Sequence, residues 1–181
     1  MKFFTKIFII SLCTILTVSL TACGGNGGGD DASSNVEQAD SNQKEYSMSD
    51  QVDIGNMEIG ISNVYEDTEI GQDNEFMESI RSRGKFVNIS MVISNLGNEE
   101  ITVNTSEFKL LSDGKLYSPS VDPAVVEALG DSFLFYKSIN PNMDMLGMIV
   151  FEVPSDLTDY SLVVEPVTSN QKAIIHLDNV N

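Results

Sequence analysis

The sequence predicts an all-β domain that begins at Tyr46. From this residue onward, apolar side chains recur at every second position, which is the period of a strand with one buried face. Turn-forming residues separate these alternating runs. No run of helical periodicity is long enough for a major helix. Together these three observations indicate an all-β fold.

The first strands follow from two apolar rows. Each row alternates with mostly small or polar residues and so predicts one buried face; the rows are Met57, Ile59 and Ile61, and then Val87, Ile89, Met91 and Ile93. Between them, residues 66–83 are predicted to be irregular. Asn95-Leu96-Gly97-Asn98 is a turn signal, and Ile101 and Val103 begin the next strand.

The middle of the domain contains the strongest hairpin signal. Phe108 to Leu111 and Lys115 to Tyr117 are apolar runs separated by Asp113-Gly114. Asp-Gly between such runs is typical of a two-residue hairpin turn.

Residues 118–138 do not reveal their strand pairing. Within them Pro123 to Leu129 predicts one short helix, because Val125, Val126 and Leu129 are spaced to pack on a sheet. Phe133 to Ile139 is predicted to be a further strand.

The last third of the chain predicts three more strands. Asn140-Pro141-Asn142 is a turn signal before a long strand, Met145 to Val153, which Pro154 ends. Alternation predicts the other two strands at Tyr160 to Val164 and Ala173 to Leu177. Seven or eight strands in about 136 residues is the number found in an immunoglobulin-like β-sandwich, so we predict that fold with one short helix.

Several short motifs in this region also resemble a known family. In order they are Gly84-Lys85-Phe86-Val87, Asn95-Leu96-Gly97, Phe108-Lys109-Leu110, Asp113-Gly114-Lys115 with Tyr117, Asn140-Pro141-Asn142, and Gly147 to Pro154. They resemble the immunoglobulin-like domain of unknown function of Gram-positive surface lipoproteins, whose fold is related to a mycobacterial immunoprotective extracellular antigen. Asn142 stands where that family more often has glycine, and Asn tolerates a left-handed turn conformation. The resemblance implies a sandwich, a surface location and no known catalytic residues.

The N-terminus predicts export and lipid attachment. Lys2 and Lys6 precede the apolar run Ile7 to Leu20, which at 14 residues is short of the roughly 20 that cross a bilayer. Leu20-Thr21-Ala22-Cys23 then resembles the lipobox of bacterial lipoproteins. The resemblance implies cleavage before Cys23 and a diacylglyceryl group on its sulfur, which supplies the two acyl chains that stable anchoring needs.

Three parts are therefore predicted: a signal peptide at 1–22, a lipidated cysteine with a flexible tether at 23–45, and the sandwich at 46–181. The tether is rich in Gly, Ser and Asp and cannot bury a core. The chain has 10 basic and 27 acidic residues, and loss of Lys2 and Lys6 with the signal leaves a net charge of −19. Such a surface repels nucleic acid, so no nucleic-acid partner is expected.

Three groups of residues could carry chemistry, and each also has an ordinary structural explanation. Met143, Met145 and Met148 offer thioethers to Cu(I), but on a strand Met145 and Met148 point to opposite faces. The acidic residues Glu66, Asp67, Glu69, Asp73, Glu75 and Glu78 could bind Ca²⁺, yet they lack the spacing of a dedicated loop and fit a solvated loop better. His176 is the only histidine, and no cysteine remains for it to activate.

We therefore predict an extracellular lipoprotein, anchored in the membrane through Cys23, whose non-catalytic sandwich binds a protein or another ligand. No catalytic residue, metal or cofactor is expected. A metal-handling (copper or calcium) or solute-binding lipoprotein is the alternative, and a cell-wall hydrolase is the third possibility.

Overall fold

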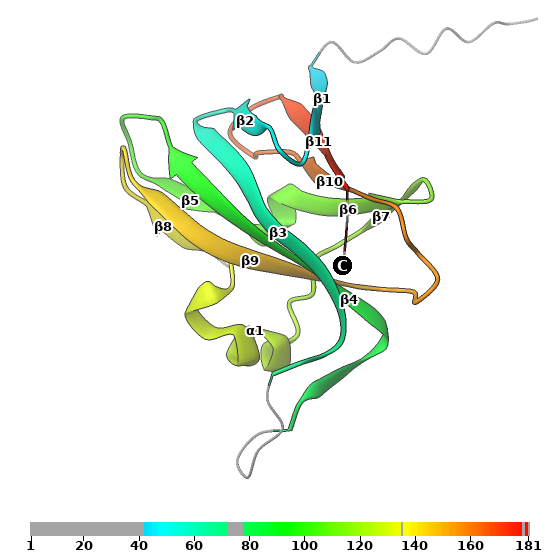
Figure 1. Cartoon of the computed structure of the whole chain (residues 1–181). Helices are drawn as coiled ribbons and strands as arrows, with labels where there is room; N and C mark the ends of the chain where they lie inside the picture. Colours follow the sequence, from blue (N-terminus) through cyan, green and yellow to red (C-terminus); the bar gives the residue numbers. More distant parts are fainter. Residues whose placement is uncertain (1–41, 72–77, 135, 179, 181) are drawn as a thin grey trace, which may run out of the picture. The chain divides into compact units, whose positions relative to one another are not determined.

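The computed structural model describes residues 42–71, 78–134, 136–178 and 180, which form two facing sheets (Figure 1). The first sheet has five strands in the order β1-β11-β10-β6-β7. These strands are β1 (Gln43–Ser47), β11 (Lys172–Leu177), β10 (Tyr160–Val164), β6 (Phe108–Ser112) and β7 (Lys115–Tyr117). All neighbours in this sheet are antiparallel except β1 and β11, which are parallel.

The second sheet has four antiparallel strands in the order β2-β3-β4-β9. They are β2 (Gln51–Ile54), β3 (Met57–Ile70), β4 (Ile80–Asn95) and β9 (Asp144–Val153). A separate two-stranded ladder joins β5 (Ile101–Val103) to β8 (Lys137–Ile139). The predicted all-β sandwich is confirmed, but its described part holds eleven strands rather than seven or eight.

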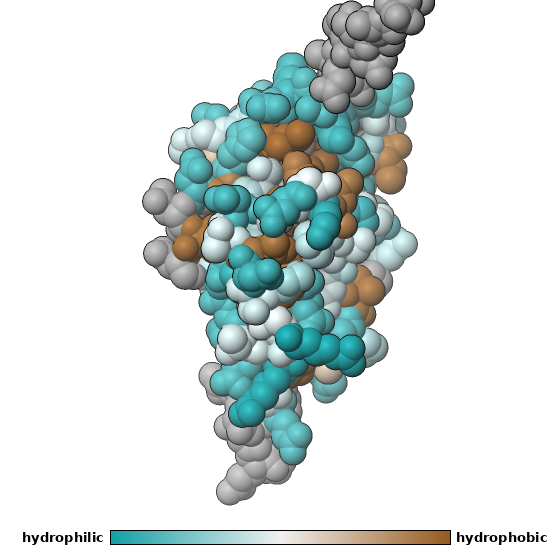
Figure 2. All heavy atoms as spheres, turned by 90° about the vertical axis from the view of Figure 1, so that its right-hand side faces the viewer, coloured by the Kyte–Doolittle hydropathy of each residue, from teal (hydrophilic) through white to brown (hydrophobic). Residues whose placement is uncertain are grey.

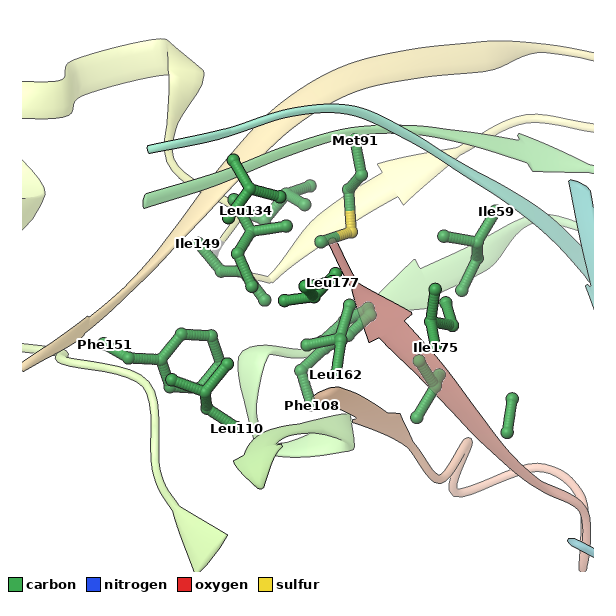
Figure 3. Packing of buried hydrophobic residues seen from close by; sticks show 14 of the residues in the cluster. Ile59, Met91, Phe108, Leu110, Leu134, Ile149, Phe151, Leu162, Ile175 and Leu177 are labelled. Carbon is green, nitrogen blue, oxygen red and sulfur yellow. The ribbon is translucent and has the colours of Figure 1, made fainter. Parts of the chain in front are cut away.

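The core lies between the two sheets and is built from the predicted rows (Figure 3). Val87, Ile89, Met91 and Ile93 of β4 are fully buried, as are Ile149 and Phe151 of β9. Leu162 and Ile175 meet them from the five-stranded sheet. The strand registers inferred from alternation are therefore confirmed at these positions.

The β3–β4 hairpin is much longer than the sequence predicted. Residues 66–83 were expected to be irregular, but β3 continues to Ile70 and β4 already begins at Ile80. Two register shifts, at Ile61/Asn63 and Asp67/Glu69, interrupt the pairing of these strands. Because each shift changes which face the next residue occupies, the period of two is lost in the sequence although the strand continues.

The domain also begins slightly earlier than predicted. Residues 43–45 were assigned to the tether, but they form β1 with Tyr46 and Ser47. This strand is mostly exposed and is held by backbone pairing to β11, so it has no alternating apolar pattern from which it could be predicted. The predicted signal peptide, Cys23 and the tether up to residue 41 lie outside the described residues.

The predicted turns are present. Asp113 and Gly114 have φ of 48° and 70° between β6 and β7, the positive values of the tightest hairpin turns. Asn142 has φ of 58°, as its tolerance of the left-handed region allows. Asn95 fixes the turn after β4, because its buried amide donates to the carbonyls of Glu99 and Ile139 and its oxygen accepts from Gly97 N–H.

The stretch 118–138 contains the predicted short helix, α1 (Pro123–Leu129), and covers one edge of β9. Ser120 N–H donates to Val150 O, and Leu134 N–H donates to Met148 O. The predicted strand Phe133–Ile139 is only partly correct: the strand is Lys137–Ile139, and Phe133 forms an isolated bridge with Met148. The Leu134 side chain enters the main core instead of following a strand.

The two ends of the sandwich differ in what they carry. At one end Asn42 enters β1, and the β2–β3 turn and the end of β4 lie nearby, at the top of Figure 1. At the other end lie α1 and the start of β4. Twelve residue-to-residue steps along β4, from Arg83 to Asn95, separate these ends by about 40 Å.

Candidate functional site

A groove of about 740 Å³ lies at the α1 end of the domain. It is larger than the hollows of about 410 and 340 Å³ elsewhere on the described part. Three segments form its walls: the start of β4, the β9–β10 connection and the segment around α1. Its lining is Ile80, Arg81, Arg83, Gly84, Phe86, Ser120, Asp122, Val125, Glu152, Val153, Pro154, Ser155 and Asp156.

The apolar side of the groove belongs to a small second core. Phe86 and Val125 are buried there, and Ile80 packs against them together with Ile70 and Val150. This cluster lies on the face of the four-stranded sheet that points away from the main core, because Phe86 and Val87 point to opposite faces of β4. It attaches α1 to the sheet and so fixes one wall of the groove.

Both arginines of the chain line this groove, at alternate positions of β4. Arg81 Nε lies 3.4 Å from Glu69 Oε2, but both side chains are largely exposed, so this pair adds little to stability. No described carboxylate pairs with the Arg83 guanidinium. Arg83 can therefore offer its planar set of donors to an anionic group of a ligand.

The groove lining also contains acidic residues, and two of their carboxylates hold the backbone in place. Glu152 Oε1 accepts from Arg83 N–H at 2.8 Å and from Ser82 Oγ at 3.1 Å. Asp122 accepts from Ala124 N–H at 2.8 Å and caps α1, with Pro123 in its first turn. Asp156 adds a further carboxylate, so the groove joins cationic and anionic side chains around an apolar floor.

Gly84 is required where β4 and β9 close the base of the groove. A Cβ at this position would lie 2.1 Å from Val153 O, which is far inside contact distance. A side chain here would push the two strands apart, and glycine therefore permits the close approach.

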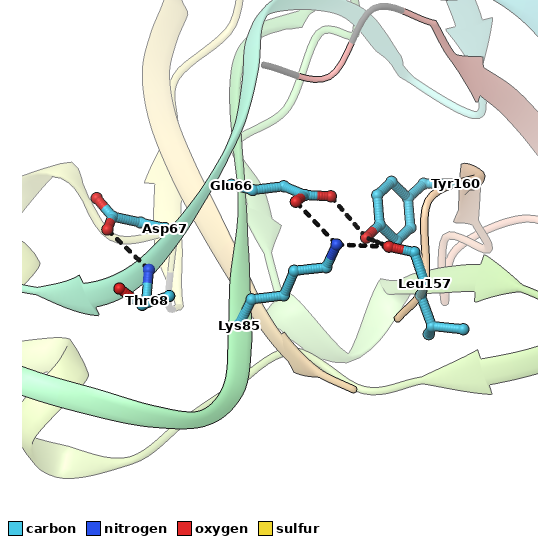
Figure 4. A network of polar contacts seen from close by, with 6 residues as sticks. All are labelled: Glu66, Asp67, Thr68, Lys85, Leu157 and Tyr160. Atoms are coloured by element: carbon cyan, nitrogen blue, oxygen red, sulfur yellow. Dashed lines mark hydrogen bonds and ion pairs between the residues drawn. The ribbon is translucent and has the colours of Figure 1, made fainter. Parts of the chain in front are cut away.

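A buried polar cluster lies between the sheets beside the groove strands (Figure 4). Lys85 Nζ donates to Glu66 Oε2 at 2.8 Å and to Leu157 O, and Tyr160 OH is 2.8 Å from Glu66 Oε1. Burial raises the pKa of Tyr160, and the nearby Glu66 carboxylate raises it further. Because Lys85 and Glu66 satisfy each other, the cluster joins the sheets and leaves neither group free to react with a substrate. Sequence reasoning missed it, since Glu66 was assigned to a solvated loop.

His176 lies on the outer face of β11, opposite the Ile175 side, as alternation predicted. Its Nδ1 is 3.1 Å from Ser161 Oγ and its Nε2 is 3.3 Å from Glu45 Oε2. From the sequence, only cysteine was considered as a partner of this histidine. The serine on β10 and the carboxylate on β1 were not anticipated. The row crosses three neighbouring strands on the outer sheet surface, where His176 and Glu45 are about half exposed. Ser161 and His176 line the open hollow of about 340 Å³ that lies there.

The methionines do not converge. Met145 packs against the main core and Met148 against the second core, so they point to opposite faces of β9 as predicted. Met143 lies exposed in the preceding turn. Gly147 does not bend the strand to bring them together; a Cβ there would meet Leu134 Cγ at 2.3 Å, so its role is to admit Leu134.

The acidic residues are also dispersed. Glu66 points between the sheets, Asp67 accepts from Thr68 N–H, and Glu69 faces Arg81 and Ser79. Asp73 and Glu75 lie outside the described residues. Within the described ranges, no three His, Cys, Asp or Glu residues are placed to hold one metal ion. In the same ranges no helix is both long and apolar enough to cross a bilayer.

Fold and groove together define the class: a β-sandwich domain with a hollow of mixed charge at one end. The chain belongs to the family described as "Domain of unknown function (DUF4352)", whose model matches residues 46–174. None of the functionally curated proteins matches it in sequence.

Solved structures from several bacteria share the fold. The Bacillus subtilis yjhA protein is 16% identical with a TM-score of 0.59, over 74% of this chain and 99% of that one. The secreted Mycobacterium tuberculosis protein MPT63 is 12% identical with a TM-score of 0.55, over 75% and 98%. A Bacillus subtilis protein described as a putative lipoprotein, ycdA, is 15% identical with a TM-score of 0.53, over 73% of this chain but 38% of that one. The predicted relation to a mycobacterial extracellular antigen fold is thus confirmed at the level of fold.

Proposed function

We propose that this chain is a lipoprotein held on the outer face of the cell membrane, and that its sandwich binds a segment of another protein in the groove. The anchor is supported by Leu20-Thr21-Ala22-Cys23 after a short apolar run with a basic start. A protein of like fold, ycdA, is itself described as a putative lipoprotein. The sandwich carries out no chemistry of its own.

The observation that carries the binding proposal is the placement of the arginines. In a chain with 27 acidic residues, Arg81 and Arg83 both line the same groove. An arginine such as Arg83, which has no ion-pair partner among the described residues and lies beside a partly apolar hollow, is suited to a carboxylate that arrives with a ligand. Asp122, Glu152 and Asp156 on the rim suit basic or amide groups of the same ligand.

A protein segment fits this combination better than a small anion does. A polypeptide presents apolar, cationic, anionic and amide groups along one strand, and the groove offers counterparts to each. The volume of about 740 Å³ is within the range of ligand pockets and holds a few side chains. The groove is also at the end remote from Asn42, so the predicted tether enters the domain without obstructing it.

The anchor is tested by Cys23→Ser. We expect this variant to remain unprocessed or to be released into the medium, because lipidation requires the cysteine sulfur. Membrane fractionation and the mass of the mature N-terminus measure the outcome. Processing and retention equal to those of the unchanged chain would refute the anchor.

The groove is tested by a photo-reactive amino acid at Ser155, an exposed rim residue. Irradiation of intact cells should give a cross-linked product of defined mass, and the same amino acid at exposed Leu116 on β7 serves as the control position. Arg83→Ser should abolish the Ser155 product, and Arg83→Lys should restore only part of it, because lysine keeps the charge but lacks the planar pair of donors. Equal products at Ser155 and Leu116, or no effect of Arg83→Ser, would exclude the groove as the binding site.

A further inference from the structure

At the end of the sandwich at which Asn42 enters, the loop tips themselves carry no charged side chain, although exposed carboxylates flank them. Four segments make up this end: residues 55–56, 96–98, 140–143 and 166–171. None of their residues is Asp, Glu, Lys or Arg, although the chain has 27 acidic residues. We refer to these four segments as the uncharged end. Exposed Glu99, Glu100, Asp144 and Glu165 border these segments directly, and Glu165 pairs with Lys172.

Hydrogen bonds join the four segments into one surface. Gly55 N–H donates to Gln171 Oε1 at 2.7 Å, and Leu96 N–H donates to Asn56 O at 2.9 Å. Asn95 N–H, next to Leu96, donates to Met143 O at 2.9 Å. The segments are therefore fixed side by side and present their tips in the same direction.

Three of these four tips carry an exposed apolar side chain. Leu96 is 57% exposed, Met143 is 56% exposed and Val167 is 77% exposed. Single exposed apolar residues are common on soluble proteins, but here three lie on adjoining loop tips. On the face shown in Figure 2, apolar side chains appear as patches among hydrophilic ones.

The position of the chain entry indicates what covers this end. Lys172 N–H donates to Asn42 O, which places the last residue before β1 beside the 166–171 loop. Cys23 precedes Asn42 by 19 residues. As a flexible coil they span about 24 Å on average and about 65 Å when fully stretched, so a lipid on Cys23 holds this end near the bilayer.

We propose that the uncharged end rests on the membrane, with Leu96, Met143 and Val167 among the lipid headgroups. This proposal rests on the lipid anchor at Cys23 proposed above. Burial of the three apolar tips at the interface favours this contact and opposes the repulsion that an anionic leaflet exerts on the flanking carboxylates. The groove at the opposite end then faces away from the membrane, towards partner proteins.

The absence of tryptophan from the chain permits a direct test. A single tryptophan is introduced at Leu96 in one variant and at Leu116 in another; the two positions are 57% and 59% exposed. Leu116 lies on β7, after the hairpin turn at the other end of β6 from the 166–171 loop, so it is the matched control. Each chain is purified with its lipid and incorporated into vesicles of phosphatidylglycerol and phosphatidylcholine, with and without brominated acyl chains.

We expect L96W emission to shift to shorter wavelength on vesicles and to lose about half of its intensity with brominated lipid, because the interface places it near the upper acyl carbons. L116W should show neither change. Equal quenching of both variants, or of neither, would overturn the proposal. A shift of L96W emission that grows with protein concentration in the absence of vesicles would show that a second copy covers this end, and would also overturn it.

The anchor and the docking surface can fail separately. Flotation of the vesicles tests the anchor alone, since a chain without lipid stays at the bottom of the gradient. If the purified chain does not float with the vesicles, the same fluorescence experiment is made with residues 23–181 coupled through Cys23 to a maleimide lipid. Quenching of L96W but not of L116W in that preparation would support docking even though the natural anchor had been refuted.

Discussion

Lys85 Nζ lies 2.8 Å from Glu66 Oε2 and joins β4 to β3 in the space between the sheets. Lys85 is buried, and its ammonium lies over the ring of Tyr160 of the opposite sheet, 5.8 Å from the ring centre. A charge buried in this way requires its partner, because the interior does not solvate it as water does. The pair therefore ties β3 to β4 within one sheet, and the hydrogen bond from Tyr160 OH to Glu66 extends the contact to the opposite sheet.

Lys85→Met should be strongly destabilising. It keeps the apolar stem but leaves the Glu66 carboxylate without its cation, and we expect a loss of about 2–3 kcal/mol in unfolding free energy. Urea unfolding measures it. The double variant Lys85→Met, Glu66→Gln is the control, since glutamine still accepts from Tyr160 but carries no charge; it should recover much of the loss. Strictly additive effects of the two replacements would contradict a coupled pair.

Tyr160 gives the domain a characteristic response to alkali. Burial, then the neighbouring Glu66, raises the pKa of Tyr160 above its ordinary value of about 10, and burial and Asp67 raise that of Tyr65. The folded state therefore keeps these protons when the unfolded state releases them. This contribution to stability is complete below pH 10 and is lost as the pH rises above it.

Absorbance near 295 nm measures the ionisation of tyrosine. We expect part of the tyrosine signal to titrate only when the domain unfolds, and Tyr160→Phe to remove part of that component. The same variant should lose stability less steeply above pH 10, even though it is less stable at pH 7. A wild-type titration in which all five tyrosines ionise near pH 10 in the folded state would contradict the assignment.

Gly84→Ala should disturb the groove and the fold together. The new Cβ would meet Val153 O, and forced displacement of packed groups costs about 1–3 kcal/mol. Gly114→Ala is the control, because φ at Gly114 is 70° but nothing lies within 4 Å, so only backbone strain of about 1 kcal/mol is expected. Thermal unfolding compares them, and an equal or smaller effect at Gly84 would show that β4 and β9 separate easily there.

The core could be predicted from the sequence better than the candidate site, and the reason is physical. The strand Val87 to Ile93 was predicted because one of its faces is buried, which gives an alternating pattern. The Asp113-Gly114 turn was predicted because a two-residue hairpin turn requires such residues. The extension of β3 past Glu66 was not predicted, because two register shifts break the alternation. For the groove, the sequence predicted α1, but Arg83, Asp122 and Glu152 are brought together by topology, which alternation does not encode.

The last prediction concerns metal ions. Residues 42–181, which keep β1 complete, should melt at nearly the same temperature with EDTA, with micromolar Cu(I) under reducing conditions and with micromolar Ca²⁺. Met145 and Met148 face different clusters, and Glu66 is already paired with Lys85, so neither set presents converging ligands. A site with a dissociation constant a hundredfold below the metal concentration would add about 2.7 kcal/mol to unfolding and raise the melting temperature by several degrees. Such a rise would refute the proposal of a protein-binding domain in favour of metal handling. If copper caused the rise, the double variant Met143→Leu, Met148→Leu would test the methionines as its ligands. If calcium caused it, Glu69→Gln would test the acidic residues.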